Sequence, residues 1–464
     1  MLRLFALASF ALLATHVPDQ DARLILDSAA ARMGGIAALR SVQRVRNETM
    51  TDWYRLAHDG RPHATTSGYE WGSEFRDYTV PAWRNTRRPM GPNGLGGELV
   101  NLVVDSIASF QLAGKWRPLN IAYVDERAEV FTFAPERVLV LAYDAPDATA
   151  LTDTVIDRKT YRRVRATLNS FKATLLFSRS DASLAAAFFA AAQPNDMGLA
   201  GWGKMDVAIW YSRWTQMREV PVILPTQLDI YRVGKPYKRV IAVGTVINPS
   251  NVGDSLAMPD SLRQSYLASG RRGMLDVQLD SARIIEGRFA TFQTPGAPVG
   301  AIKLGGRWLM LEGGSVPLVT ERSVAFLAKS DAGTPVAGAI VTMPSAQGGI
   351  QWLSDHGMSA WITPGTQQTI DAVKRGWKPG IRTVGVAKGS WVRVGNDSVR
   401  VETIDLPDAP GTAVLYVPSM RWMYSYLASA PRYLEPILAL AKERGWVVDR
   451  VGSTASVAGK PVSP

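Results

Sequence analysis

The 464-residue chain contains no cysteine. This absence excludes disulfide bonds, thiolate metal ligands and cysteine nucleophiles together, so the fold must be stabilised by packing. Histidine is also scarce, with four in the whole chain. Because imidazole is a preferred zinc ligand and the usual general base near neutral pH, this scarcity limits both kinds of chemistry.

Runs of basic residues are lacking as well, although the formal net charge is +11. The densest basic stretch is Arg162-Arg163-Val164-Arg165, and the other Lys and Arg residues are spread over the chain. A nucleic-acid site concentrates such residues on one stripe or patch. The distribution therefore indicates a solvated basic surface and no nucleic-acid partner.

No apolar run is long enough to cross a bilayer as a helix. The apolar stretch from Leu4 to Ala14 follows Arg3 and is followed at once by polar residues, which favours a secretory signal over a membrane anchor. A buried N-terminal helix is the alternative. We predict a signal peptide at residues 1–20, a periplasmic or secreted protein, and no transmembrane segment in the mature chain.

The length and the 46% hydrophobic content predict two or three compact domains. The polar stretch 258–273, which ends in Arg271-Arg272-Gly273, is a candidate boundary. We therefore predict an α+β protein with a β-rich N-terminal domain at 21–272 and a second domain at 273–464.

The N-terminal part mixes hairpin patterns with helical ones. Residues 151–168 and 226–249 alternate around short turns and predict two β-hairpins. The apolar stretches 96–114 and 180–193 predict helices, and 23–45 predicts two short helices interrupted at Gly34-Gly35.

This pattern weakly resembles the curved antiparallel sheets of bacterial lipoprotein-carrier-like domains. The resemblance is one of pattern and not of motif. It implies a sheet that wraps helices and can hold an apolar ligand. A β-domain with a filled core is the alternative.

In the C-terminal part, strands and helices alternate. Two strands flank a Gly305-Gly306 turn, and further helices and hairpins follow up to the strand pattern at 446–453. Two sheets with helices on their outer sides, an αββα sandwich, would account for this order.

The succession "LMLEGG", "ERSVAFLAK", "AIVTM", Gly348-Gly349 and Tyr416-Val417-Pro418 resembles the metallo-β-lactamase superfamily over roughly residues 274–456. The resemblance implies a zinc site in which a His-x-His-x-Asp-His loop follows the strand "AIVTM". It also implies a later His and Asp that bracket the hairpin, and a last His after the final strand. The matching parts are scaffold.

Five of the six ligand positions implied by this resemblance hold residues that cannot bind zinc well, and Asp408 lies near the sixth. The loop has no His or Asp, the later His position falls near Asp408 or Ala409, and the bridging Asp falls near Leu427 with Ser425 next best. The degenerate former site consists of Thr342, Met343, Ser345, Gln347, Asp408, Leu427 and Ser453. The sequence therefore predicts no bound metal and no cofactor.

Histidines elsewhere cannot rebuild this site. His356 is the only one in the C-terminal part, and its place before Gly357 predicts a helix cap. His58 and His63 fall in a predicted N-terminal loop. Ser345 lies between a strand and a helix but lacks both the Gly-x-Ser-x-Gly elbow and a His base, so serine hydrolysis is disfavoured.

The leading hypothesis is a secreted pseudoenzyme: a metallo-β-lactamase-like fold with a degenerate, metal-free site that acts as a binding or structural protein. Its partner would be an apolar small molecule or another protein. An active hydrolase with unusual ligands is one alternative, and a carrier of apolar cargo is another.

Limited proteolysis should cut near residues 265–275, because Arg271-Arg272-Gly273 has the composition of an exposed linker. Two stable fragments should result, which mass spectrometry can assign. Cleavage inside "GAIVTM" or "TAVLYVP", with the 270 region intact, would show that the boundary is misplaced.

Overall fold

The computed structural model describes residues 19–462 except 57–64, 92–93, 119–121, 194–195, 197–198, 200–202, 251–255, 269–278, 280–281, 293–298, 315, 344–347, 374–379 and 407–408. His16, His58 and His63 lie outside the described residues, as does the predicted signal peptide up to residue 18.

The N-terminal half is built on one 14-stranded antiparallel sheet. Its order is β7-β6-β5-β3-β2-β1-β14-β13-β12-β11-β10-β9-β8, with β4 paired to β3. The strands are β1 (Arg44–Leu56), β2 (Thr65–Asp77), β3 (Ala82–Gly91), β4 (Gly94–Leu95), β5 (Leu99–Val104), β6 (Ile107–Leu112), β7 (Lys115–Pro118), β8 (Thr149–Ile156), β9 (Lys159–Leu168), β10 (Phe171–Ser178), β11 (Leu184–Ala192), β12 (Lys204–Gln216), β13 (Ile223–Arg232) and β14 (Lys235–Ile247).

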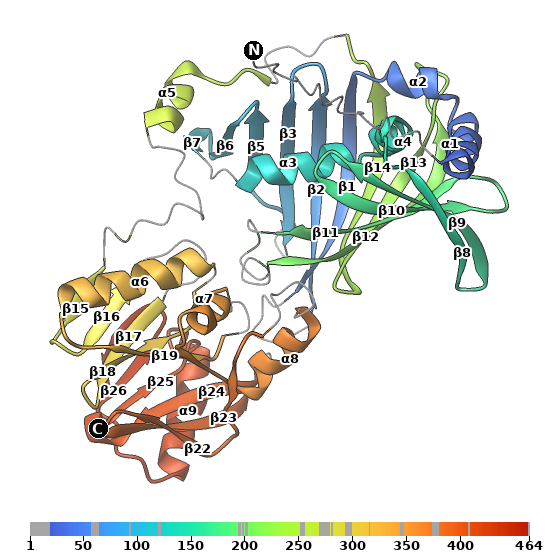
Figure 1. The fold of residues 1–464 in the computed structure, drawn as a ribbon. Helices are drawn as coiled ribbons and strands as arrows, with labels where there is room; N and C mark the ends of the chain where they lie inside the picture. Colours follow the sequence, from blue (N-terminus) through green and yellow to red (C-terminus); the bar gives the residue numbers. More distant parts are fainter. Residues whose placement is uncertain are drawn as a thin grey trace, which may run out of the picture.

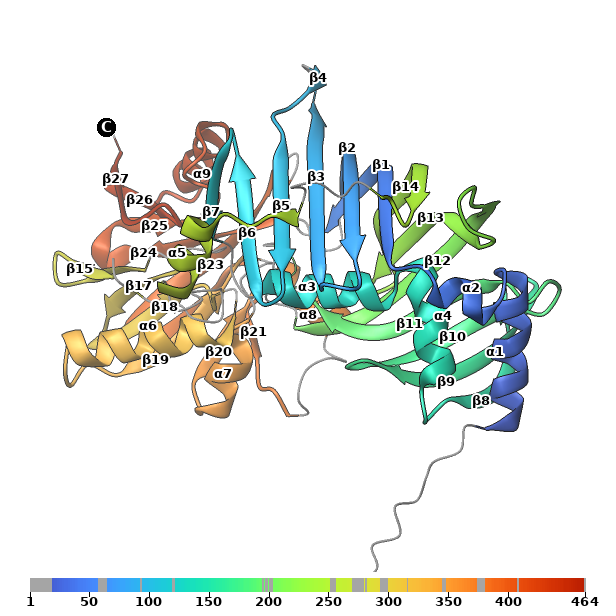
Figure 2. The same cartoon turned by 90° about the horizontal axis from the view of Figure 1, so that it is seen from above.

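Helices pack on one face of this curved sheet. They are α1 (Gln20–Arg32), α2 (Ile36–Arg40), α3 (Ala122–Thr132) and α4 (Pro135–Asp144), and Figures 1 and 2 show α3 and α4 crossing the face. Leu26 of α1 and Leu139 of α4 share a buried core with Val164, Leu175 and Val207 of the sheet. The sheet thus wraps helices, as the sequence predicts.

Both predicted hairpins are confirmed. Strands β8 and β9 are joined at Asp157 and Arg158, whose φ angles are 49° and 64°. Strands β13 and β14 are joined at Val233 and Gly234, with φ angles of 47° and 74°. Positive φ at both central residues gives a turn whose twist matches that of the paired strands.

The helices predicted at 96–114 and 180–193 are wrong. Residues 96–114 contain the hairpin of β5 and β6, which turns at Asp105 with φ 51°. Residues 184–192 form β11, paired with β10 and β12. Alanine favours helices, but Leu184, Ala187 and Phe189 lie in the core and Ala186 is buried as well. Burial in a central strand overrides the local propensity.

The C-terminal half contains two further sheets. A seven-stranded sheet comprises β15 (Arg283–Ile285), β16 (Phe289–Phe292), β17 (Val299–Leu304), β18 (Arg307–Leu311), β19 (Val336–Val341), β20 (Ser359–Ile362) and β21 (Val384–Gly385). A six-stranded sheet comprises β22 (Ser390–Val394), β23 (Asp397–Leu406), β24 (Ala409–Val417), β25 (Trp422–Tyr424), β26 (Arg450–Ser453) and β27 (Ser456–Pro461).

These sheets form the middle layers of a four-layer arrangement. A buried cluster with Ile302 and Leu309 from the first sheet and Val401 and Leu415 from the second lies between them. The other face of the first sheet packs against α6 (Pro317–Ser330), α7 (Ile350–Asp355) and α8 (Pro364–Val373). The other face of the second packs against α9 (Pro431–Glu443). The predicted mixture of helices and strands in this half is confirmed.

The described elements on either side of the predicted boundary belong to different sheets. Helix α5 (Asp260–Ala268) contacts β6 and β7, and its Leu262 is buried beside Leu102 and Ile107. The next described strand, β15, begins at Arg283. The predicted boundary falls on the last turn of α5 and on residues outside the described ones. No helix in the described ranges combines the length and hydropathy needed to cross a membrane.

Close packing at the start of α7 explains one of the two glycines at 348–349. A methyl group at Gly349 would lie 1.8 Å from Thr320 Oγ1 and 1.9 Å from the Gly313 carbonyl oxygen. The Thr320 hydroxyl donates to that same carbonyl at 2.6 Å. The turn after β18 therefore fixes the start of both α6 and α7.

Replacing Gly349 with Ala should destabilise the C-terminal half by about 2 kcal/mol or more, because the added methyl group meets buried backbone. Denaturant unfolding measures the change. Gly385→Ala is the matched control, since a methyl group there meets nothing within 4 Å. Equal effects of the two substitutions would contradict this packing account.

Candidate functional site

A buried carboxylate organises the region in which the sequence predicts a degenerate former metal site. Glu312 follows β18, which runs parallel to β19, and the pairing of Leu311 with Ile340 brings Glu312 beside the end of β19. The backbone N–H groups of Thr342 and Met343 each donate to Glu312 Oε2 at 2.8 Å. The Thr342 hydroxyl donates to Oε1. Thr342 and Met343 are therefore held beside the end of the neighbouring strand β18.

The environment of Glu312 disfavours its charge. Its side chain is completely buried, and burial raises its pKa from 4.5 to about 7, although the three donors act in the opposite direction. Its charge also contributes, after burial, to a raised pKa of the nearby Tyr424. Glu312 therefore titrates close to neutral pH in the folded protein.

The other predicted site residues provide no metal ligands. Met343 and Leu427 are half-buried and pack against the core between the two sheets. Ser453 is buried at the end of β26. Ser345, Gln347 and Asp408 lie outside the described residues. The structure thus brings Thr342 and Met343 together around Glu312 and places Leu427 and Ser453 in packed surroundings.

A zinc ion does not fit the donors at these positions. Zinc in proteins needs three or four imidazole, thiolate or carboxylate donors. Thr342, Met343, Leu427 and Ser453 supply a hydroxyl, a thioether, an alkyl group and a second hydroxyl. In the part of the chain that the structure describes, no three His, Asp or Glu side chains are grouped so that they could hold a metal.

The predicted capping role of His356 is confirmed. It is the C-cap residue of α7, and its backbone N–H bonds to the carbonyl of Leu353 at the helix end. Its Nδ1 lies 2.8 Å from the Trp352 carbonyl oxygen. Its ring stacks on that of Trp352 at 3.9 Å between centroids.

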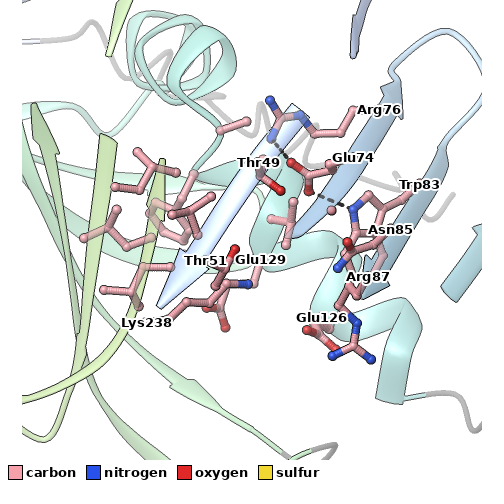
Figure 3. Close-up of a pocket in the computed structure, with 18 of the residues that line it drawn as sticks. Thr49, Thr51, Glu74, Arg76, Trp83, Asn85, Arg87, Glu126, Glu129 and Lys238 are labelled. Carbon is pink, nitrogen blue, oxygen red and sulfur yellow. Dashed lines mark hydrogen bonds and ion pairs between the residues drawn. The ribbon is translucent and has the colours of Figure 1, made fainter. Parts of the chain in front are cut away.

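A second candidate site lies in the N-terminal half, where a cavity of about 100 Å³ separates the sheet from α3. Figure 3 shows Trp83, Asn85 and Arg87 projecting in a row from β3 and Glu126 and Glu129 approaching from α3. The remaining lining residues come from β1, β2, β12, β13, β14 and the α3–α4 region: Thr49, Thr51, Glu70, Gly72, Glu74, Arg76, Val130, Phe133, Ala134, Ile209, Leu228, Ile230, Lys238 and Val240.

One wall of this cavity is an ion-pair network. Glu74 accepts a hydrogen bond from Arg76 Nη1 at 2.9 Å and another from Trp83 Nε1 at 2.8 Å. A second guanidinium nitrogen of Arg76 lies 3.1 Å from Glu136, which is buried and also accepts the Tyr78 hydroxyl at 2.5 Å. Buried charges of this kind are stable only when paired.

The helix contributes more negative charge. Glu126 and Glu129 lie one turn apart on α3, so their carboxylates repel each other. Arg232, which is 3% exposed, donates to Glu129 at 2.7 Å. Burial nevertheless raises the pKa of Glu129 more than Arg232 lowers it, and Glu126 adds to the rise.

The opposite wall is apolar. It consists of Ile209, Leu228, Ile230 and Val240 from neighbouring strands, together with Phe133. Leu228 pairs with Val240, and Ile209 pairs with Ile230, so these side chains lie on one face of the sheet. The cavity therefore offers an apolar side and a charged side to whatever occupies it.

Sequence reasoning missed both Glu312 and this cavity. The signal for Glu312 is a single carboxylate directly after four apolar residues, 308–311, at the end of a buried strand. The signal for the cavity is the alternation of Glu70, Glu74 and Arg76 on one face of β2, next to Thr49 and Thr51 on β1. Such polar residues on a covered face indicate a polar interior.

No protein-family model and no curated protein matches the chain. Among solved structures, a putative outer membrane lipoprotein-sorting protein domain from Vibrio parahaemolyticus is 6% identical, covering 54% of this chain and 98% of its own, with a TM-score of 0.30. A LolA superfamily protein from Nitrosomonas europaea is 10% identical over 52% of this chain and 99% of its own, with a TM-score of 0.32.

A metallo-beta-lactamase from Pontibacter korlensis is also similar in structure. It is 13% identical, covers 39% of this chain and 96% of its own, and gives a TM-score of 0.29. At these identities and TM-scores the likenesses establish neither a family nor an activity.

Replacing Glu312 with Gln should remove a pH dependence of stability. Because the unfolded chain releases this proton near pH 4.5 and the folded chain near pH 7, the stability that Glu312 confers below pH 4.5 falls by about 3 kcal/mol as the pH rises to 7. Gln keeps an acceptor for the two N–H groups but does not titrate. Denaturant unfolding at several pH values measures the difference from wild type.

The control for this measurement is Glu321→Gln, which changes an exposed carboxyl group on α6. Its stability should follow the wild-type pH curve. Parallel curves for wild type and Glu312→Gln would show that the pKa of Glu312 is the same in the folded and unfolded chains.

Proposed function

We propose that this chain is a metal-free binding protein. In this proposal its C-terminal half is a metallo-β-lactamase-like sandwich that has lost its metal site, and its N-terminal half holds a small ligand in the cavity against α3. The observation that carries the proposal is the tie between Glu312 and the amides of Thr342 and Met343. The oxygen of this carboxylate already accepts hydrogen bonds from two backbone amides, so it is not positioned to bind zinc.

The packing of the former site supports the same conclusion. Met343 and Leu427 contact the inner core, so apolar side chains occupy positions where the family resemblance implies zinc ligands. The described residues at these positions supply neither a set of zinc ligands nor an imidazole that could activate an attacking water. A hydrolase with unusual ligands is therefore the weaker reading.

The N-terminal cavity supports binding as the remaining activity. It lies between the sheet and a helix, and it presents convergent polar groups beside apolar ones, as ligand sites commonly do. Its charged wall disfavours a purely apolar cargo, because an acyl chain would leave Glu74 and Arg76 further desolvated without new partners. The predicted signal peptide places the proposed binding in the periplasm or outside the cell.

The protein should purify without stoichiometric zinc, iron or manganese, and a chelator should leave its Tm unchanged. In a zinc-dependent relative, metal at a thousandfold excess over its Kd would stabilise the fold by roughly 4 kcal/mol. Here the donors are absent, so this stabilisation should be absent as well. Elemental analysis of protein prepared without a histidine tag or added metal tests the expectation.

Hydrolysis is measured on the same preparation. β-Lactams, lactones and thioesters should not be cleaved above background. One or two equivalents of a transition metal, lost on chelation together with a hydrolytic rate, would overturn the proposed function.

A further inference from the structure

The N-terminal cavity has a size that limits its ligand. This inference rests on the proposed function, because it names the ligand class of the same cavity. A volume of about 100 Å³ corresponds to roughly eight water molecules. A molecule or headgroup of about eight to ten non-hydrogen atoms therefore fits.

The α3 side of the cavity is acidic. Four glutamates and three cationic side chains line the cavity, and Arg232 adds a fourth cation that pairs with Glu129. The two neighbouring carboxylates of α3, and not an excess of negative charge, therefore favour a ligand cation. Glu126 and Glu129 share one turn of α3, and Arg232 donates to Glu129 at 2.7 Å. A ligand ammonium group at this turn would offset the repulsion between the two carboxylates.

Two arginine donors on the basic side of the cavity lack a hydrogen-bond acceptor in the part of the chain that the structure describes. Arg87 uses Nη1 for a long contact of 3.5 Å to Glu70, and its buried Nε has no hydrogen-bond partner among the described residues. Arg76 Nε is also buried and has no hydrogen-bond partner among the described residues. A buried donor without a partner costs about 1–3 kcal/mol. An oxygen of a ligand would supply the missing partner.

The acceptor must lie on the cavity side of Arg87. Arg87 is opposite Gly72 in the β2–β3 pairing, and a methyl group at Gly72 would lie 2.5 Å from the Thr86 carbonyl oxygen and 3.5 Å from Thr49 Oγ1. The position over Gly72 is therefore closed to a ligand atom. Leu228, Ile230 and Val240 lie on the same side of the sheet and form the apolar wall.

We propose that the cavity binds a small zwitterion with an apolar part. The ammonium group lies at Glu126 and Glu129, the acidic group lies at Arg87, and the apolar part packs against Leu228, Ile230 and Val240. Free aliphatic amino acids and zwitterionic lipid headgroups share this chemistry.

Isothermal titration of the full chain with L-leucine tests the proposal. The comparison ligands are leucinamide, which has only the cation, N-acetyl-leucine, which has only the anion, oleate, and phosphatidylethanolamine vesicles. L-Leucine should bind at least about tenfold more tightly than either singly charged analogue, since each loses one charged hydrogen-bonding group.

Two variants separate the ends of the ligand. Arg87→Gln should weaken L-leucine about tenfold or more and leave leucinamide unchanged. Glu126→Gln should weaken L-leucine and leave N-acetyl-leucine unchanged. Glu98→Gln is the control, because Glu98 is exposed, pairs with Arg88 and does not line the cavity. A variant that merely misfolds would weaken all ligands alike, so this crossed pattern is specific to binding.

The outcomes distinguish the two proposals. Binding of the vesicles in place of L-leucine, with the same dependence on Glu126 and Arg87, would support the zwitterion and assign a lipid source. Preference for oleate, or equal affinity for L-leucine and leucinamide, would overturn the zwitterion and leave the binding function intact. Failure of every ligand to bind at millimolar concentration would overturn both.

Discussion

The cost of burying a carboxylate governs both candidate sites of this protein. An ionised carboxylate taken from water must find donors or cations inside the fold, or else keep its proton. Glu312 finds two backbone amides and one hydroxyl. Glu74 finds an arginine and a tryptophan. In each case the carboxylate fixes the neighbouring chain, and its position decides what chemistry the region can support.

The two halves meet this constraint in different ways. In the C-terminal half a single carboxylate accepts hydrogen bonds from two backbone amides and one hydroxyl, which hold Thr342 and Met343 beside the end of β18. In the N-terminal half several charges meet at a cavity, and the arginines retain donors that have no partner among the described residues. The polar groups around Glu312 already have partners, whereas a ligand could supply the missing partners of the arginine donors at the cavity. This difference is why the proposed binding is assigned to the N-terminal half.

Much of the fold could be predicted from the sequence where local signals agree with the tertiary structure. The turns at Asp157-Arg158 and Gly305-Gly306 and the amphipathic helix of 317–330 carry such signals. The strand β11 could not be predicted, because its alanines favour a helix when read alone. Only its pairing with two neighbours determines its conformation.

The candidate sites were less predictable than the elements that carry them. The lack of His and Asp at 342–347 can be read directly from the residue types. The cavity cannot be read in this way, because it joins Glu70 and Arg87 to Glu126 across three elements that are distant in the sequence. Glu312 shows the same limit. Its place in an apolar segment predicts a buried carboxylate, but the sequence does not show which groups bind it.

The close approach of Gly349 to the Gly313 carbonyl has a consequence for how this chain can diverge. A side chain with free space around it can be exchanged for others of similar size at little cost in stability. A glycine held against backbone has no such freedom. Position 349 is therefore restricted to glycine for as long as the turn after β18 keeps this packing.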